Sequence, residues 1–260
     1  MKISELFPHT FKALRHKLGH DRPHDTRPLW QRRLSADSNF CRAMVSGGYL
    51  TEQQMQHAVE RYRLGRSRDG GVIFWQADTL GNIYDGKIMH YRSDGHRDHD
   101  RKPTWVSFLL RKHGLVPEDW KPEHCLFGTH LLGHTEGTDG TDASVPVAVV
   151  EAEKTAVIMS EQQPDYLWLA AGGLHELTAT KLFPLRGRRI VLFPDTDPEG
   201  EAYATWYRVT MEAQRLLGQP IYLSPLLEQR ASAEQKQCKI DIVDYWFGGS
   251  KRGGCAAQTG

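Results

Sequence analysis

Residues 147–151 read Val-Ala-Val-Val-Glu, and residues 190–197 read Ile-Val-Leu-Phe-Pro-Asp-Thr-Asp. Each stretch is a short apolar run that carboxylates follow at once or after a single proline. A continuous apolar run of four residues predicts a strand that is buried on both faces, as the strands of a parallel sheet are. The two stretches therefore predict an α/β domain in which acidic side chains follow the ends of two strands.

The chain around these two runs alternates between helical and strand patterns. We expect helices at 153–162, 175–182 and from 198 to about 217, and strands at 147–150, 166–170, 189–193 and 220–224. Strands that alternate with helices favour a parallel, doubly wound sheet. The fold class predicted for residues 145–247 is therefore α/β, with a parallel sheet flanked by helices.

The upstream residues 41–132 predict a smaller α+β module. Thr51-Glu-Gln-Gln54 has the form of a helix-initiating capping box, and Gly65 is placed to end that helix. An apolar stripe at helical spacing lies between them, formed by Met55, Ala58, Val59 and Tyr62. Runs rich in β-branched and aromatic residues at 72–76 and 83–91 flank a turn at 78–82 and predict a hairpin. A second helix is expected at 105–113.

Three segments are expected to lack regular structure: a basic N-terminal arm at 1–40, a Gly-, Thr- and Asp-rich linker at 133–144, and a tail at 248–260. Residues 1–33 hold eight Lys or Arg against three acids. Such a segment gains free energy along a phosphate backbone through counterion release, although a solvated arm has the same composition. The predicted nucleic-acid contacts are Arg15, Lys17, Arg32, Arg33 and Lys87.

The composition limits the class of protein. Hydrophobic residues make up 39% and charged residues 25% of the chain, and the net charge is +1, all ordinary for a soluble globular protein. No apolar run approaches the roughly 18 residues that span a bilayer, so no membrane partner is expected. The four cysteines lie far apart without a C-x-x-C pair, which favours reduced thiols in the cytoplasm and neither a disulfide framework nor a zinc ribbon.

The acids at the strand ends predict a metal site. Glu151 follows one predicted strand, and Asp195 and Asp197 follow another. Ligands of open parallel sheets bind beyond the carboxyl ends of the strands. Carboxylates that lie this close repel, and a hard divalent cation relieves the repulsion; oxygen ligands favour Mg²⁺ or Mn²⁺ over Zn²⁺. The alternative is that these acids are helix caps and surface charges.

Three stretches carry a resemblance to a known family. Residues 149–156 (Val-Val-Glu-Ala-Glu-Lys-Thr-Ala) look like the first motif of the Toprim, or topoisomerase–primase, domain. Residues 190–200 resemble its Asp-x-Asp motif, and residues 239–245 are similar to the Lys-Asp-x-x-Asp segment of primase-type Toprim domains. The three stand in the family's order within residues 145–247. One departure is Ala152, where the family generally has Gly.

The resemblance implies roles for individual residues. Asp195 and Asp197 would be metal ligands, with Asp241 or Asp244 as a peripheral ligand. Glu151 would act as a general acid or base or as a metal partner. Lys154 follows Glu151 by three residues, which favours a contact with a substrate phosphate over simple solvation.

The upstream module has a family resemblance of its own. Residues 60–65, 72–76 and 86–91 resemble the segment before the Toprim domain in primase-like proteins of bacterial mobile elements. Those relatives often begin with a zinc ribbon, which this sequence does not show. That departure counts against template recognition, and hence against true primase activity, and leaves open whether a zinc-ribbon partner is supplied in trans.

Together the resemblances imply Mg²⁺-dependent phosphoryl or nucleotidyl transfer by a DNA primase-like protein of mobile-element replication. The partners would be single-stranded DNA or RNA and NTPs, with a replicative helicase as a candidate partner in trans. A Toprim-type nuclease and a DNA-binding accessory protein without turnover remain alternatives. A haloacid-dehalogenase-like phosphatase also uses Asp-x-Asp after a strand, but its motif usually sits on the first strand and continues differently.

Overall fold

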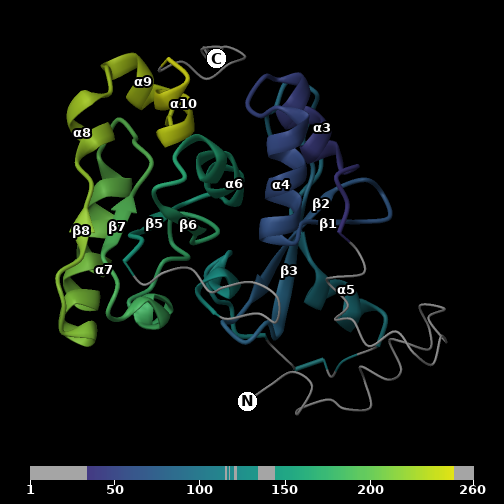
Figure 1. The fold of residues 1–260 in the computed structure, drawn as a ribbon, viewed down its shortest axis with the longest axis horizontal. Helices are drawn as coiled ribbons and strands as arrows, with labels where there is room; N and C mark the ends of the chain where they lie inside the picture. The colour runs from purple at the N-terminus through teal and green to yellow at the C-terminus, as the bar shows by residue number, and fades with distance from the viewer. Residues whose placement is uncertain (1–33, 115, 117, 120–121, 134–143, 249–260) are drawn as a thin grey trace. The chain divides into compact units, whose positions relative to one another are not determined.

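The computed structural model describes residues 34–114, 116, 118, 119, 122–133 and 144–248. The chain divides into two compact units, Met1–Cys125 (unit 1) and Leu126–Gly260 (unit 2), whose elements are labelled in Figure 1. Most of the predicted arm, the inner part of the predicted linker and nearly all of the predicted tail lie outside the described residues. Leu126, Leu131 and Leu132 precede that linker but pack in the core of unit 2.

Unit 2 is built on a four-stranded parallel sheet of order β6-β5-β7-β8. The strands are β5 (Val147–Val150), β6 (Leu167–Ala170), β7 (Ile190–Phe193) and β8 (Tyr222–Leu223). Val150 is in register with Ala170 of β6 and with Phe193 of β7. The predicted α/β class with a parallel sheet is confirmed, and the carboxyl ends of β5, β6 and β7 lie at one edge.

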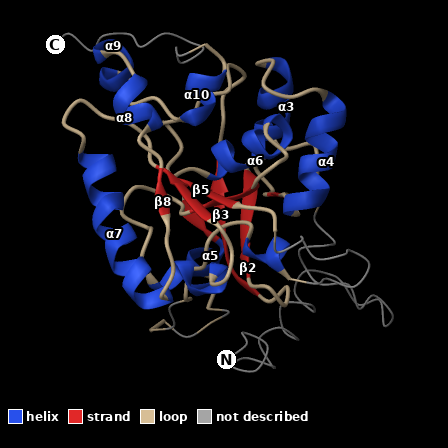
Figure 2. Cartoon of the chain, turned by 60° about the vertical axis from the view of Figure 1, so that its left-hand side comes forward, coloured by secondary structure: helices blue, strands red, loops and turns tan. Residues whose placement is uncertain are grey.

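Helices flank this sheet (Figure 2). They are α6 (Glu153–Gln162), α7 (Glu201–Leu217), α8 (Leu226–Arg230), α9 (Ala233–Gln237) and α10 (Ile242–Trp246), with a 3₁₀ helix η3 at Thr180–Leu185. Val147 and Val149 share one buried cluster with Leu182 of η3 and Trp206 of α7. Helix α6 packs on β5 and β6. Helices therefore cover the sheet, so that β5 and β6 are fully buried and β7 alternates buried and partly buried residues.

Two predictions in unit 2 are wrong in detail. The helix expected at 175–182 is replaced by turns and by η3. There the Lys181 N–H donates to the Thr178 hydroxyl, a side-chain bond that competes with the helical ladder, and Pro184 has no N–H to donate. Helix α7 begins at Glu201 and not at 198, because Gly200 before it takes a left-handed conformation with φ 69°.

Unit 1 carries an antiparallel sheet of order β1-β2-β3-β4. The strands are β1 (Gly65–Arg66), β2 (Val72–Ala77), β3 (Ile83–Met89) and β4 (Thr104–Trp105). The hairpin of β2 and β3 is confirmed, and the Asp78 carboxylate accepts the N–H groups of Leu80 and Asn82 in its turn. Helix α5 (Val106–Lys112) follows β4 directly. Trp105 is therefore the last residue of β4 and not, as predicted, the first residue of the helix.

Helix α4 (Glu52–Tyr62) has the predicted capping box between Thr51 and Gln54, and the predicted apolar stripe is its buried face. Its end differs from the prediction, because Arg63 and not Gly65 adopts the left-handed conformation, with φ 56°. Gly65 lies in β1 instead. A Cβ atom there would come within 2.7 Å of Trp75 Nε1, so this glycine serves close packing.

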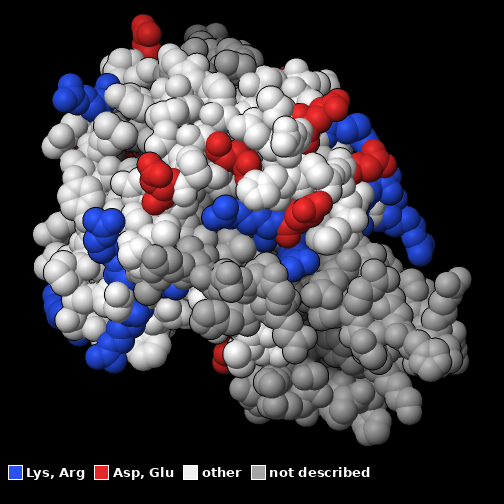
Figure 3. Space-filling view, viewed as in Figure 1, with Lys and Arg blue, Asp and Glu red and all other residues white. Residues whose placement is uncertain are grey.

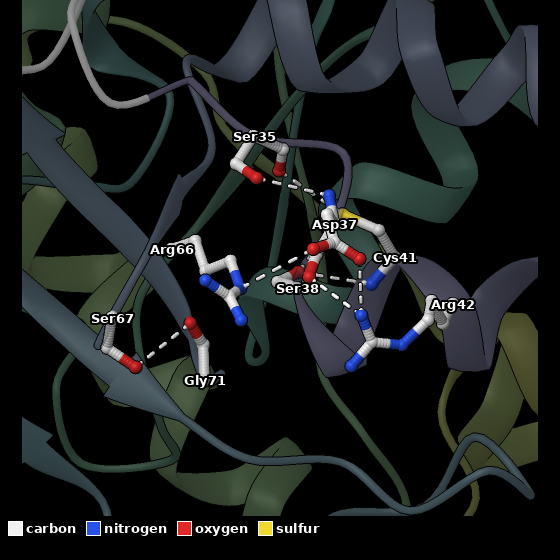
Figure 4. Close-up of polar contacts among 8 residues, drawn as sticks. All are labelled: Ser35, Asp37, Ser38, Cys41, Arg42, Arg66, Ser67 and Gly71. Carbon is white, nitrogen blue, oxygen red and sulfur yellow. Dashed lines mark hydrogen bonds and ion pairs between the residues drawn. The ribbon is translucent and has the colours of Figure 1, made fainter. Parts of the chain in front are cut away.

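Helix α3 (Asn39–Ser46) starts at a small polar network (Figure 4). Ser38 caps the helix by accepting the Cys41 N–H at 3.2 Å. The Asp37 carboxylate pairs with Arg42 of α3 and, at 3.9 Å, with Arg66 of β1. The boundary predicted between residues 40 and 41 therefore falls inside a capped helix.

The expectation of reduced thiols is wrong for Cys238. Cys238 is disulfide-bonded, whereas Cys41 and Cys125 are free. A disulfide depends on Cα atoms lying a few ångströms apart in space, which separation along the sequence does not measure.

The described surface carries charges of both signs. On the face drawn in Figure 3, Lys and Arg side chains are interspersed with Asp and Glu. With a net charge of +1, binding to a polyanion would depend on local groups rather than on a field of the whole molecule. Within the described part of the chain, none of the helices has the length and apolar character needed to cross a membrane.

Candidate metal centre

The ends of β5 and β7 bring two of the predicted residues together. Glu151 follows β5, and Asp195 follows β7 after one proline. Because the strands are in register, the Asp195 backbone N–H donates to Glu151 Oε1 at 3.3 Å. Residues that are 44 positions apart thus meet at the carboxyl edge of the sheet, where parallel sheets bind ligands.

Asp197 is held by the chain that leads into α7. Its Oδ1 atom accepts the N–H groups of Glu199 and Glu201, both at 3.0 Å, and its Oδ2 atom accepts that of Ala202 at 2.7 Å. Burial raises the pKa of Asp197, but these N–H groups and the charge of Lys239 outweigh burial and leave the pKa below its ordinary value. Asp197 is therefore a fixed anion, and it also caps α7.

Asp241 comes from a third segment. It forms a reciprocal capping box with Asp244 at the start of α10, in which Asp241 Oδ1 accepts the Asp244 N–H at 2.8 Å. Its other oxygen, Oδ2, accepts the Thr155 hydroxyl of α6 at 2.6 Å. Both acids are buried, and the Asp244 carboxylate faces the Asp241 backbone N–H at 3.3 Å. Of the two, Asp241 is the one oriented by α6.

Glu151 shows that these acids share one electrostatic environment. Its pKa is raised from 4.5 to about 7, first by burial and further by the charges of Asp197 and Asp241. The Asp195 N–H lowers the pKa but only in part. A carboxyl that is 9% exposed and faces two other carboxylates destabilises the fold when it ionises, and a cation would remove that cost.

The donor set fits a hard divalent cation. Glu151, Asp195, Asp197 and Asp241 offer only carboxylate oxygens, which Mg²⁺ and Mn²⁺ prefer. The hydroxyl of Thr196 is buried and has no hydrogen-bond partner among the described residues. No group of three His, Cys, Asp or Glu residues in the described ranges already stands in metal-binding geometry. The side chains would therefore have to converge on an ion as it binds.

The backbone conformations of Ala152 and Gly172 define the turns next to Glu151. Ala152 has φ −98° and ψ 143°, an extended conformation open to any residue, so the alanine found in place of glycine fits without strain. Gly172, with φ 98°, follows β6 and donates its N–H to the Glu151 carbonyl at 2.8 Å. That amide is therefore engaged by the backbone and is not available to bind a phosphate.

The remaining predicted residues are Lys154 in unit 2, Lys87 in unit 1 and four basic residues of the N-terminal arm. Lys154 lies in the first turn of α6 and is partly buried. Lys87 lies in unit 1 on β3, in register with Phe74 and Trp105. Arg15, Lys17, Arg32 and Arg33 lie outside the described residues.

Sequence reasoning missed two polar residues at this edge. Thr155 orients Asp241, and Glu153 is 2% exposed, with Gly172 packed beside it. The available signal was their place in the first turn of the helix after β5, since that turn starts at the carboxyl edge of the sheet.

Comparisons with known proteins place the chain in a family. No curated protein matches its sequence. Among solved structures, it is similar to the primase fragment of the bacteriophage T7 primase-helicase protein, with 15% identity, a TM-score of 0.43, and coverage of 76% of this chain and 68% of that one. A family model, described as "Domain of unknown function (DUF6371)", matches residues 38–196. Since that match covers more than half of the chain, from α3 through β7 into the Asp-x-Asp segment, the protein belongs to the DUF6371 family.

Proposed function

We propose that this protein carries out Mg²⁺- or Mn²⁺-dependent phosphoryl or nucleotidyl transfer on nucleic acid, as a Toprim-type, DNA primase-like enzyme of mobile-element replication. The carrying observation is the group of acids at the carboxyl edge of the unit 2 sheet. These four acids come from three separate segments: Glu151 after β5, Asp195 and Asp197 after β7, and Asp241 at the start of α10. Burial and the charges of Asp197 and Asp241 raise the pKa of Glu151. Acids whose pKa is perturbed by burial and by neighbouring charges cluster at functional sites.

In this proposal Asp195, Asp197 and Glu151 hold the cation, with Asp241 at its periphery. A bound divalent cation would neutralise negative charge on phosphate oxygens. Asp197 is a suitable fixed ligand because three backbone N–H groups orient it. Glu151 would accept or return the proton of the attacking or leaving hydroxyl, and Lys154 would contact a substrate phosphate.

The first test is calorimetry of Mg²⁺ and Mn²⁺ binding to the full chain. Asp195→Asn removes a proposed ligand charge while it leaves the Asp197 caps of α7 in place. Asp165→Asn is the matched control, since Asp165 is exposed and precedes β6 at the opposite end of the strand. We expect wild type and the control to bind, and Asp195→Asn to lose at least tenfold in affinity. Equal binding by all three proteins, or no binding even with nucleic acid present, would contradict the proposed site.

The second test separates the activities. Labelled single-stranded DNA or RNA is incubated with NTPs and Mg²⁺, with and without a replicative helicase. Incorporation of nucleotides that Asp195→Asn abolishes supports the primase-like activity. Cleavage without NTPs would replace it with a nuclease, and binding with neither reaction would leave a DNA-binding accessory protein.

A further inference from the structure

Unit 1 contains a cavity of about 670 Å³ beside β4 and α5 that the proposed metal site does not use. Three aromatic rings and two cations line it: Trp105, Phe108, His124, Lys102 and Arg111. The volume falls in the range of small-molecule sites, roughly 300–1,000 Å³. All of these residues belong to unit 1, whereas the acids of the proposed metal site belong to unit 2.

The aromatic wall is held in place from behind by a buried carboxylate. The side chain of Asp85 is 0% exposed and accepts the Ser107 hydroxyl at 2.6 Å and the N–H groups of Gly86 at 2.7 Å and Ser107 at 2.9 Å. The His124 Nε2 atom lies 3.1 Å from Asp85 Oδ2. Since a carboxylate only accepts, that nitrogen carries the proton and donates.

This hydrogen bond fixes the imidazole against Trp105. The two rings stack with centroids 4.2 Å apart and an angle of 20° between their planes. Trp105 itself is fixed by its pairing with Lys87 in the sheet. The stacked pair is therefore a preorganised wall, and a flat ligand that packs against it would not have to order it first.

Helix α5 contributes an exposed aromatic ring, Phe108, and a cation, Arg111, to the lining of the cavity. Val106 and Leu109 pack toward the Ile73–Trp75–Ile88 cluster, whereas Phe108 is 51% exposed and lines the cavity. Arg111 follows Phe108 by three residues, which places both on one face of the helix. An exposed aromatic ring beside a cation is thus presented toward the open space.

The charge of the cavity selects an anion. Its described lining includes no carboxylate, and within the described residues neither Lys102 nor Arg111 forms an ion pair. Asp85 lies behind the wall, and its oxygens are occupied by the donors named above. A ligand that satisfies this site needs a planar ring for the aromatic wall and a negative group for Lys102 and Arg111.

We propose that this cavity binds a nucleotide, with its base against the aromatic residues and its phosphate at Lys102 and Arg111. Aromatic side chains stack on any base, and cations beside them hold the backbone phosphate. The ligand is either a free nucleotide or one nucleotide of a single strand, which share this chemistry. The proposal goes beyond the metal-dependent function and does not rest on it.

The test is calorimetry on the full chain in EDTA, so that a failure of the metal site leaves the result unaffected. The probes are AMP, a short single-stranded thymidine oligonucleotide and inorganic phosphate. The variants are Phe108→Ala and Arg111→Gln. Their controls are Phe183→Ala, which removes an equally exposed phenylalanine (51%) from unit 2, and Lys112→Gln, which removes the neighbouring α5 cation outside the cavity lining.

We expect Phe108→Ala to weaken binding roughly 5- to 100-fold and Arg111→Gln to weaken it several-fold with a smaller salt dependence, while both controls bind as wild type does. Binding of AMP identifies a free nucleotide as the ligand, and binding of the oligonucleotide alone identifies a strand. The proposal is overturned if neither binds, if the controls weaken binding equally, or if phosphate competes fully and Phe108→Ala has no effect. Thermal unfolding of each variant checks that it is folded.

Discussion

Glu151 is a buried carboxyl near two other acids, Asp197 and Asp241, so its ionised form is unfavourable in the folded protein. Its pKa is about 7 in the folded protein and near 4.5 when exposed. Between these pH values the folded state binds more protons than the unfolded state, so the free energy of unfolding falls as pH rises. The stabilisation by the protonated form is complete below about pH 4.5 and is lost as pH rises through 7.

We therefore expect Glu151→Gln to be more stable than wild type at pH 8 in EDTA, by about 1–3 kcal/mol, and close to wild type at pH 5. Urea unfolding of both proteins at the two pH values measures this. Taking the difference between them removes the contributions of other titrating groups. A stability difference that does not change with pH would show that Glu151 is ordinary in the folded state.

Thr155 is the residue that ties Asp241 to α6 through a hydrogen bond of 2.6 Å. Thr155→Val keeps the shape but leaves a buried carboxylate oxygen without this donor. We expect a loss of about 1.5–3 kcal/mol in the free energy of unfolding. Thr210→Val is the control, since the buried Thr210 hydroxyl donates only to the Trp206 carbonyl within its own helix. Chemical denaturation that finds the two variants equal would remove Thr155 from the site's support.

At the scale of elements, the start of a helix can be predicted directly from capping residues in the sequence. In α4 the Thr51 hydroxyl accepts the Gln54 N–H at 3.2 Å, and the Gln54 side chain accepts the Thr51 N–H at 2.9 Å. Thr51→Ala removes one of these bonds and should cost about 1 kcal/mol of stability. Gln53→Ala, an exposed change in the same first turn, should be nearly neutral. Thermal or urea unfolding that ranks them in the reverse order would contradict the capping role.

The helix that was predicted wrongly shows the limit of that information. Residues 175–182 have a helical pattern, yet Thr178 bonds the backbone of Lys181 and Pro184 interrupts the ladder, so a 3₁₀ helix forms. Asp197, which the sequence predicts as a metal ligand with a helix cap as the alternative, accepts three N–H groups at the entry to α7. Competition between side-chain and backbone hydrogen bonds decides both cases, and a periodicity argument does not weigh it.

At the scale of the whole molecule, the proposed cation should stabilise one unit and not the other. A ligand that binds only the folded state adds stability to the part that holds it. We expect Mg²⁺ to slow amide hydrogen exchange in β5, β7 and the start of α7, and to leave β2 and β3 of unit 1 unchanged. Exchange measured by mass spectrometry with and without Mg²⁺ tests this. Asp195→Asn should show no effect of Mg²⁺ in either unit.

The sequence by itself determined the local elements: the apolar strands β5, β6 and β7, the hairpin of unit 1 and the capped helix α4. These depend on apolar runs, turn residues and caps within a few positions of one another, so the chain states them directly. It also located Glu151, Asp195 and Asp197 after two strands, because the end of a strand is a local feature.

Only the tertiary structure decided which elements are neighbours. It put β5 beside β7, joined Thr155 to Asp241 across 86 positions, and set His124 against Asp85 across 39. The raised pKa of Glu151 and the aromatic cavity of unit 1 both follow from these long-range placements. The physical reason is that burial and electrostatic coupling depend on distances in space, which packing of the whole core sets and no single stretch of sequence contains.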